Sequence, residues 1–272
     1  PVAIALRKYL DVSKANDPVS VAREAFESAL AFLSYLAASE AIAHDLLGNQ
    51  MKKFAHRSMG PLRELLQKSL GLLGNQAEFS KPAKSLTGKY KNQFDTALNE
   101  FNNHKHDKLL GKDVSAHDHL VMIINICREV MNEKYFGFTV NLEKERFKRD
   151  SYKGGFKVAH DNQPFVKRVE IKTEQGFRED KAILIDKNNG QCLTMSPLMF
   201  WMENDSYSVP YNCYVYDKYD EKVDQFLLKP CSEKRLERAI DISEDLDSIY
   251  HSLREDGLKG FSKIQQIEIN KT

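Results

Sequence analysis

The chain has 272 residues, of which 42% are hydrophobic and 29% are charged, a composition typical of folded globular proteins that excludes a wholly disordered chain. Its 40 lysines and arginines balance 39 aspartates and glutamates, so the formal net charge is only +1. This balance gives the molecule no overall attraction for nucleic acid or an anionic membrane, and any such binding requires a local patch.

The cysteines and the longest apolar stretch both indicate a cytoplasmic protein. The cysteines are Cys127, Cys192, Cys213 and Cys231. They form no CxxC pair of the kind that zinc sites use, so we expect reduced thiols. The longest apolar stretch, residues 29–38, is interrupted by Ser34 and Tyr35 and is much shorter than the roughly 20 residues that cross a bilayer. We therefore expect it to lie in a protein core and expect no membrane contact.

Two helices are predicted in the first quarter of the chain. Asp17 and Pro18 form a good helix start, because the aspartate accepts hydrogen bonds from free backbone N–H groups and the proline has no N–H to leave unpaired. Apolar residues then recur at helical spacing to about residue 47. A second start at 58–61 opens a leucine-rich amphipathic stretch that ends near Gly74, a typical C-cap residue.

Two further helices complete the predicted bundle. Phe94, Leu98 and Phe101 keep the i, i+4, i+7 spacing of a helix that lays one apolar stripe on a core. The most apolar helix is predicted over residues 115–136, where a serine opens it. Four helices with short connections favour an antiparallel bundle, and we expect this bundle to occupy residues 1–145.

The apolar period changes after about residue 145. Residues 146–164 are highly charged and contain Gly154-Gly155, which predicts a linker or an exposed excursion, and we place the domain boundary there. Beyond the linker the period approaches 2, as in β-strands, over residues 165–172 and 182–195. In the second of these stretches Asn189-Gly190 is a strong hairpin signal, because both residues tolerate the positive φ of a tight turn.

The rest of the chain predicts a second hairpin, a helix and a last strand. Residues 211–216 and 223–228 suit the hairpin, residues 232–253 the helix and residues 261–269 the strand. We expect one antiparallel sheet of four or five strands in a β-rich domain over residues 165–272. The predicted fold class is α+β: an N-terminal antiparallel helical bundle followed by a small antiparallel β-sheet domain with a C-terminal helix.

Residues 101–107, Phe-Asn-Asn-His-Lys-His-Asp, are the segment most suggestive of chemistry. Two imidazoles and two amides meet here at the mouth of the predicted bundle, and a histidine there can act as a general base at neutral pH. The alternative is a solvated polar connection. Metal binding through this segment and His117-Asp118 would use a spacing that matches no standard site, so we expect neither a metal nor another cofactor.

Basic residues gather in two places. Lys52, Lys53, Arg57 and Arg63 form one cluster, and residues 144–149 contain the other. Either cluster can meet phosphates, but a basic run on an otherwise neutral protein is usually a solvated face. Nucleic-acid binding by the first cluster is therefore one of the alternatives that the sequence leaves open.

Three segments of the first half follow one another in a familiar order. They are Arg57-Ser-Met-Gly60 before a leucine-rich helix, an Asn-Asn-x-x-His stretch at residues 102–106, and the long apolar helix after Ser115. This order resembles HEPN-like helical domains of prokaryotic defence and signalling proteins. In that family an arginine, usually followed by a polar residue, precedes a histidine near the start of the last long helix, and in active members the pair cleaves RNA.

The resemblance implies site residues with one departure from the family. The family's histidine corresponds to His106 and its polar residue to Asn103, while Asn102 stands in the place of the arginine. An arginine would stabilise the charge that develops on a phosphate, and a neutral amide cannot replace a cation. In a nuclease, a distant arginine such as Arg57 or Arg63 would have to complete the site.

The second half carries a resemblance of its own. It lies in residues 193–201, Leu-Thr-Met-Ser-Pro-Leu-Met-Phe-Trp, and in the hairpin of residues 211–228. These segments resemble the strands that follow such helical domains in larger bacterial regulators. Because no catalytic site can be read in the sequence, we predict a non-catalytic sensor, adaptor or regulatory module, which binds a protein or ligand or forms a homodimer. The resemblance implies that it belongs to a prokaryotic antiviral defence or signalling system. The alternatives are a HEPN-type metal-independent ribonuclease and an RNA-binding protein.

Overall fold

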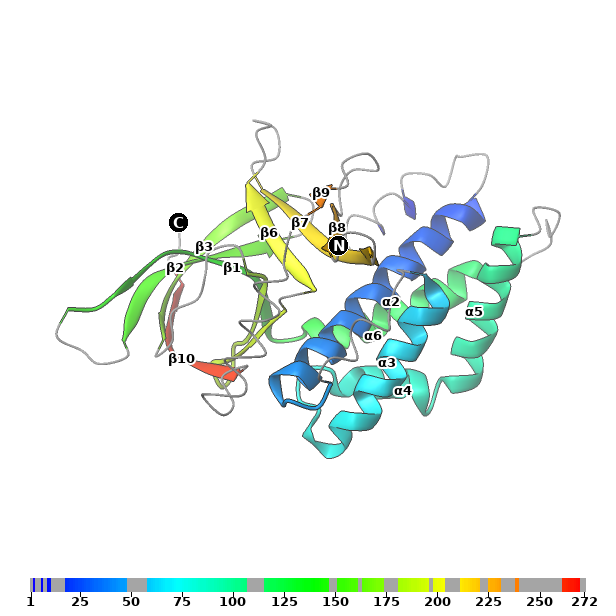
Figure 1. Ribbon diagram of the computed structural model, residues 1–272, viewed down its shortest axis with the longest axis horizontal. Coiled ribbons are helices and arrows are strands. Elements are labelled where there is room, and N and C mark those ends of the chain that lie inside the picture. The colour runs from blue at the N-terminus through cyan, green and yellow to red at the C-terminus, as the bar shows by residue number, and fades with distance from the viewer. Residues whose placement is uncertain are drawn as a thin grey trace.

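Helices fill the first half of the chain and antiparallel strands fill the second half (Figure 1). The computed structural model describes residues 18–47, 58–106, 115–146, 151–160, 163–173, 181–195, 198–203, 211–220, 225–230, 238–239 and 261–269, together with Val2, Leu6, Tyr9 and Leu10. The predicted α+β class is confirmed.

The four longer helices described lie close to their predicted positions. They are α2 (Pro18–Ala43), α3 (Met59–Leu73), α5 (Lys91–His106) and α6 (Ala116–Met131), and the short helices η2 (Gly74–Gln76), η3 (Lys81–Ala83) and α4 (Lys84–Thr87) lie between α3 and α5. Asp45 and Glu133 take positive φ values of 56° and 54°, which a right-handed helix does not allow. For this reason α2 and α6 end earlier than predicted.

Helix α2 is the central helix of the fold. Every residue from Ala29 to Ala43 is buried, and α2 contacts α3, α5, α6 and β5. By length and composition α2 is the one helix in the described part of the chain that could cross a membrane, but 89% of its apolar window is buried inside the protein. The predicted core position of residues 29–38 is confirmed.

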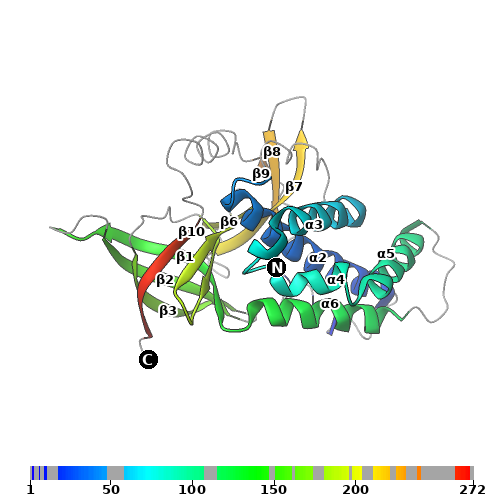
Figure 2. The same ribbon diagram turned by 90° about the horizontal axis from the view of Figure 1, so that it is seen from below.

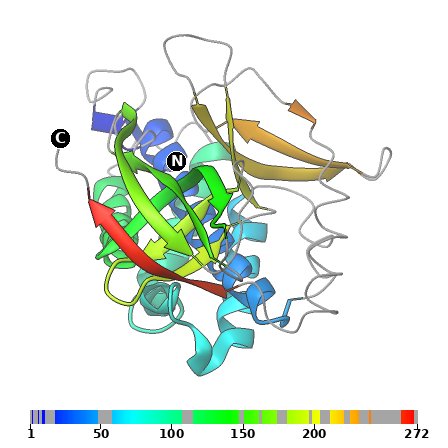
Figure 3. The same ribbon diagram turned by 90° about the vertical axis from the view of Figure 1, so that its left-hand side faces the viewer.

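Six strands pair edge to edge into a closed antiparallel barrel. They are β1 (Lys134–Lys144), β2 (Tyr152–His160), β3 (Gln163–Thr173), β4 (Ile183–Asp186), β5 (Gln191–Thr194) and β10 (Phe261–Ile269). Their order around the barrel is β1-β2-β3-β10-β5-β4, and β4 closes the barrel against β1. Strand β10, red in Figure 3, comes from the far end of the chain and pairs with both β3 and β5. Closure therefore depends on pairing between segments far apart in sequence.

The barrel has an apolar cluster of its own. Its buried members are Phe156, Val158, Ile171, Ile183, Ile185 and Cys192. Beside this cluster β1 and β2 approach so closely at Gly137 that an added Cβ atom would lie 1.8 Å from the backbone oxygen of Lys157. Only a residue without a side chain fits there.

A second antiparallel sheet lies beside the helices. Its strands, in order, are β6 (Met199–Glu203), β7 (Tyr211–Asp220), β8 (Gln225–Pro230) and β9 (Arg238–Ala239). On α2, Tyr35 donates its hydroxyl to the backbone oxygen of Tyr216 on β7 (2.5 Å), and Ser39 donates to the backbone oxygen of Met195 after β5 (3.3 Å). One apolar cluster runs from the helices into both sheets, so helices and strands share a core.

The strands begin earlier than the expected boundary at residue 145. Strand β1 starts at Lys134, inside the range expected to be helical, and leads on directly from α6 (Figure 2). Strand β2 occupies Tyr152–His160, inside the expected linker at 146–164. The linker prediction is wrong, because the Gly-Gly pair lies in β2 and pairs with both neighbouring strands.

Both predicted hairpins are present, but they belong to different sheets. Strands β4 and β5 pair in the barrel, with Gly190 at a φ of 70°, and β7 and β8 pair in the second sheet. This corrects the expectation of one sheet of four or five strands. The predicted last strand is β10. The helix predicted over 232–253 lies outside the described residues except for Arg238–Ala239, which form β9.

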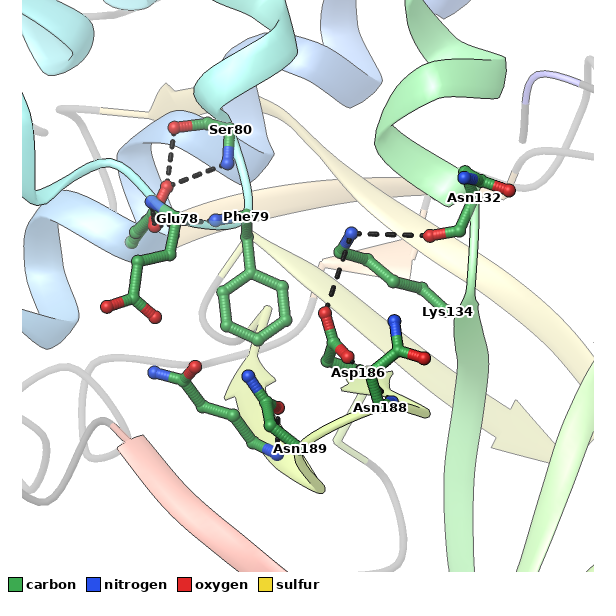
Figure 4. A network of polar contacts seen from close by, with 10 residues as sticks. Glu78, Phe79, Ser80, Asn132, Lys134, Asp186, Asn188 and Asn189 are labelled. Atoms are coloured by element: carbon green, nitrogen blue, oxygen red, sulfur yellow. Dashed lines mark hydrogen bonds and ion pairs between the residues drawn. The ribbon is translucent and has the colours of Figure 1, made fainter.

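A buried carboxylate fixes the connection between η2 and η3. Glu40 on α2 is fully buried. Its oxygens accept hydrogen bonds from the backbone N–H groups of Glu78 (2.5 Å), Phe79 (2.8 Å) and Ser80 (2.9 Å), and from the Ser80 hydroxyl (2.5 Å). Figure 4 labels the three residues of this connection. Four donors satisfy the buried carboxylate, so residues 78–80 are held against α2.

Candidate functional site

The predicted site residues lie on the last turns of α5. Asn102 is half-buried, Asn103 is exposed, and His106 is the last residue of the helix. Asn102 and His106 stand four positions apart, so they share one face of α5. The structure thus brings the three residues to one end of the helical region, next to the start of α6. We call this place, the last turns of α5 with the first turn of α6, the bundle end.

The bundle end is held together by a buried histidine, His119 on α6. This side chain is only 3% exposed. Its Nε2 atom lies 2.7 Å from Glu100 Oε2 on α5 and 3.0 Å from Ser115 Oγ at the start of α6. The Phe101 ring meets the imidazole edge to face, with centroids 5.9 Å apart. These contacts join α5 to the first turn of α6.

The Glu100 carboxylate determines which ring nitrogen of His119 carries the proton in the hydrogen bond between them. A carboxylate only accepts hydrogen bonds, so the imidazole of His119 donates to Glu100 through Nε2. The same nitrogen cannot then take a proton from the Ser115 hydroxyl, as the base of a serine nucleophile must do. The other ring nitrogen, Nδ1, is buried and has no hydrogen-bond partner within the described ranges. His119 therefore holds α5 and α6 together and does not act as a base for Ser115.

The second histidine of α6 is held by the N-terminal segment. The Tyr9 hydroxyl lies 3.3 Å from His117 Nδ1, and the two rings stack with centroids 6.4 Å apart. His117 is otherwise exposed, as is Asp118 beside it. The exposed polar side chains of the bundle end therefore come from two helices, α5 and α6, that are joined to each other.

The bundle end has to be interpreted from its own contacts. No family model, curated protein or solved structure matches this chain. Among the residues that the structure describes, no group of three or more histidines, cysteines, aspartates or glutamates is placed to hold a metal ion.

Of the predicted basic cluster, the structure describes only Arg63. The Arg63 guanidinium lies 2.6 Å from Asp95 Oδ1, and this ion pair links α3 to α5. Asp95 precedes His106 by three turns of α5, about 16 Å along the axis. Arg63 therefore does not complete a site around His106. Lys52, Lys53 and Arg57 lie outside the described residues.

The described cysteines are all buried. They are Cys127, Cys192 and Cys213, and Cys231 lies outside the described residues. Burial raises the pKa of the Cys127 thiol to about 12. The thiol therefore stays protonated at neutral pH and is a poor nucleophile.

The sequence interpretation did not single out Glu100 or His119. The available signal was the position of His119 among the apolar residues of α6: it is buried together with Ala116, Leu120 and Ile123. A buried imidazole needs a polar partner, and that requirement predicts an acid or hydroxyl nearby. It does not say which residue of another helix supplies the partner.

Proposed function

We propose that this chain is a non-catalytic sensor or adaptor module, HEPN-like in its helical region, that works in the cytoplasm as part of a prokaryotic defence or signalling system. It binds a protein partner or a second copy of itself. The observation that supports this proposal is the contact of His119 Nε2 with Glu100, 2.7 Å long and buried on the imidazole side. This imidazole fixes the bundle end and is not available as a base to Ser115.

The bundle end is the surface that we assign to recognition. Asn103, His117 and Asp118 are exposed there, and they offer amide, imidazole and carboxylate groups on two helices. Because α5 and α6 are already joined, these groups are ordered before a partner arrives. Binding to an ordered surface costs less conformational entropy than binding to a loose one.

A second candidate function is a metal-independent ribonuclease that uses His106 as its base. It is favoured by the shared helix face of Asn102 and His106, which stand one turn apart on α5. Against it stand the neutral amide of Asn102 and the pairing of Arg63 with Asp95, since a developing phosphate charge needs a cation.

RNA cleavage in a chelator separates the two candidates. Wild-type and His106→Ala proteins are incubated with end-labelled single-stranded RNA in excess EDTA. We expect both to show only the cleavage seen in buffer, because neither contains an active base and cation pair. Cleavage by the wild type that is lost in His106→Ala would establish the ribonuclease instead.

Sedimentation velocity over a wide concentration range tests recognition by a second copy. We expect reversible association that weakens at least fivefold in Asp118→Lys, since this residue is exposed at the bundle end. Glu129→Lys is the matched control, because it makes the same charge change at an exposed site near the other end of α6. A strictly monomeric wild type that also degrades RNA would contradict the proposal.

A further inference from the structure

The connection between α3 and α5 carries a local positive charge that the balanced net charge hides. We call residues 80–93 the lysine segment. It contains Lys81, Lys84, Lys89 and Lys91 and no aspartate or glutamate. The segment spans η3, α4 and the start of α5, and α4 lies at the lower edge of the helical region in Figure 1.

Three of these four lysines are available for a partner. Lys84 is half-buried and donates to the backbone oxygen of Gly74, at the C-terminal end of α3. Lys81, Lys89 and Lys91 are exposed. In the part of the chain that the structure describes, none of these three forms an ion pair. Their charges are therefore not neutralised by neighbouring acids.

An aromatic ring lies among these cations. Lys89 Nζ stands 4.8 Å from the centroid of the Tyr90 ring, which is half-buried. Exposed amides follow at Asn92 and Gln93. Cations beside an aromatic ring are the combination that surfaces for single-stranded nucleic acid use, with lysines on the phosphates and ring faces for bases.

The backbone of the lysine segment is fixed from both sides. At its start, Ser80 is held by the buried Glu40 carboxylate through its N–H and its hydroxyl. Within it, Tyr90 N–H donates to the backbone oxygen of Ser85 (2.7 Å), and Leu86 is fully buried. The lysines therefore project from an ordered backbone, which lowers the entropy cost of placing them on a ligand.

From this arrangement we infer that the lysine segment is a binding surface for the phosphodiester backbone of a single-stranded nucleic acid, distinct from the bundle end. A membrane surface fits less well. Peripheral membrane segments insert exposed apolar residues beside their cations, whereas the large apolar residues at and within this segment, Phe79, Leu86 and Phe94, are all buried.

Fluorescence anisotropy with labelled 20-nucleotide single strands of RNA and DNA tests the inference on the full chain. Three phosphate contacts give a slope of about −2 in a plot of log affinity against log salt, which is about a twenty-fold loss between 50 and 200 mM salt. Equal binding of RNA and DNA supports recognition of the phosphodiester backbone alone. Tighter binding of RNA supports the same surface with added contacts to the 2′-hydroxyl.

The decisive variant replaces Lys81, Lys89 and Lys91 by glutamine. We expect this triple variant to lose at least a hundredfold in affinity at 50 mM salt, with its salt slope reduced to near zero. The matched control replaces three exposed cations outside the segment, Arg128 on α6 and Lys153 and Lys187 in the barrel, by glutamine and makes the same change in net charge. We expect the control to bind within twofold of the wild type.

The inference has clear contrary outcomes. It is overturned by a wild-type affinity that does not change with salt, by a control triple variant that loses as much affinity as the lysine-segment variant, or by binding to phosphatidylserine vesicles in place of oligonucleotides. Folding is monitored by thermal unfolding of each variant. Because all six substituted side chains are exposed, the unfolding temperatures are expected to coincide with that of the wild type.

Discussion

The helical region and the barrel enclose their apolar interiors by different means. Around α2, polar groups inside the core reach other elements: Glu40 accepts from residues 78–80, and Tyr35 donates to β7. The barrel instead closes through backbone pairing of strands from distant parts of the chain, and β2 approaches β1 closely at Gly137.

This difference indicates where each part is vulnerable. In the helical region a substitution harms the fold chiefly when it removes a partner of a buried polar group, because backbone hydrogen bonds within helices are local. In the barrel a substitution harms the fold when it separates two strands, because every pairing there joins different strands. Single substitutions in each part test this contrast, beginning with the largest expected effect.

Gly137→Ala is expected to damage the fold more than any other of these substitutions. The added Cβ would lie 1.8 Å from the backbone oxygen of Lys157, so β1 and β2 would have to separate. We expect the free energy of unfolding to fall by about 4 kcal/mol or more, a loss reserved for severe overpacking. Urea unfolding followed by circular dichroism measures it.

Gly71→Ala is the matched control for that substitution. Gly71 lies inside α3, and an added Cβ there would meet nothing within 4 Å. Since alanine favours a helix over glycine, we expect the free energy of unfolding to rise by about 0.5–1 kcal/mol. If both glycine variants behaved alike, the proposed tight contact in the barrel would be wrong.

Glu40→Ala tests the polar anchor of the helical region and should rank second. The substitution leaves three backbone N–H groups and the Ser80 hydroxyl without their buried acceptor. We expect a loss of about 3 kcal/mol in the free energy of unfolding, because each unsatisfied buried donor is costly. Glu78→Ala is the control, since its side chain is exposed, and it should change stability by less than about 0.5 kcal/mol.

The same contrast explains how much of the fold the sequence could predict. Helices reveal themselves through a period that is local, so α2, α3, α5 and α6 were located from their apolar spacing. Strand β1 was missed, because residues 136–140 are all buried and a strand buried on both faces shows no alternation. Closure of the barrel by β10 could not be predicted, since nothing local in residues 261–269 specifies partners in β3 and β5.

The candidate site was predictable only in part for a related reason. The sequence placed Asn102, Asn103 and His106 together, because neighbours on one helix have a fixed geometry. The partnership of Glu100 with His119 depends on how α5 packs against α6, which spacing along one helix does not determine. Likewise, the pairing of Arg63 with Asp95 joins two helices and could not be inferred from the basic cluster.

The smallest of the predicted effects depends on pH and tests whether the thiol of Cys127, in the core of the helical region, is shielded from water. Burial holds the pKa of Cys127 at about 12, against an ordinary value of 9.0. Because the folded-state pKa is raised, the stabilisation is complete below pH 9 and is lost as the pH rises toward 12. Each pH unit in that window removes up to about 1.4 kcal/mol, so about 2 kcal/mol is lost by pH 10.5.

Cys127→Ala isolates this contribution from other groups that titrate in alkali. Lysines and tyrosines change charge in both proteins, so the difference between wild type and variant reports on the thiol alone. We expect the variant to be less stable than the wild type at pH 8, since it leaves a cavity beside α2, and the difference to shrink by about 2 kcal/mol at pH 10.5. A difference that stays constant across this range would mean that water reaches Cys127, and the core around α2 would then be less closed than its buried residues indicate.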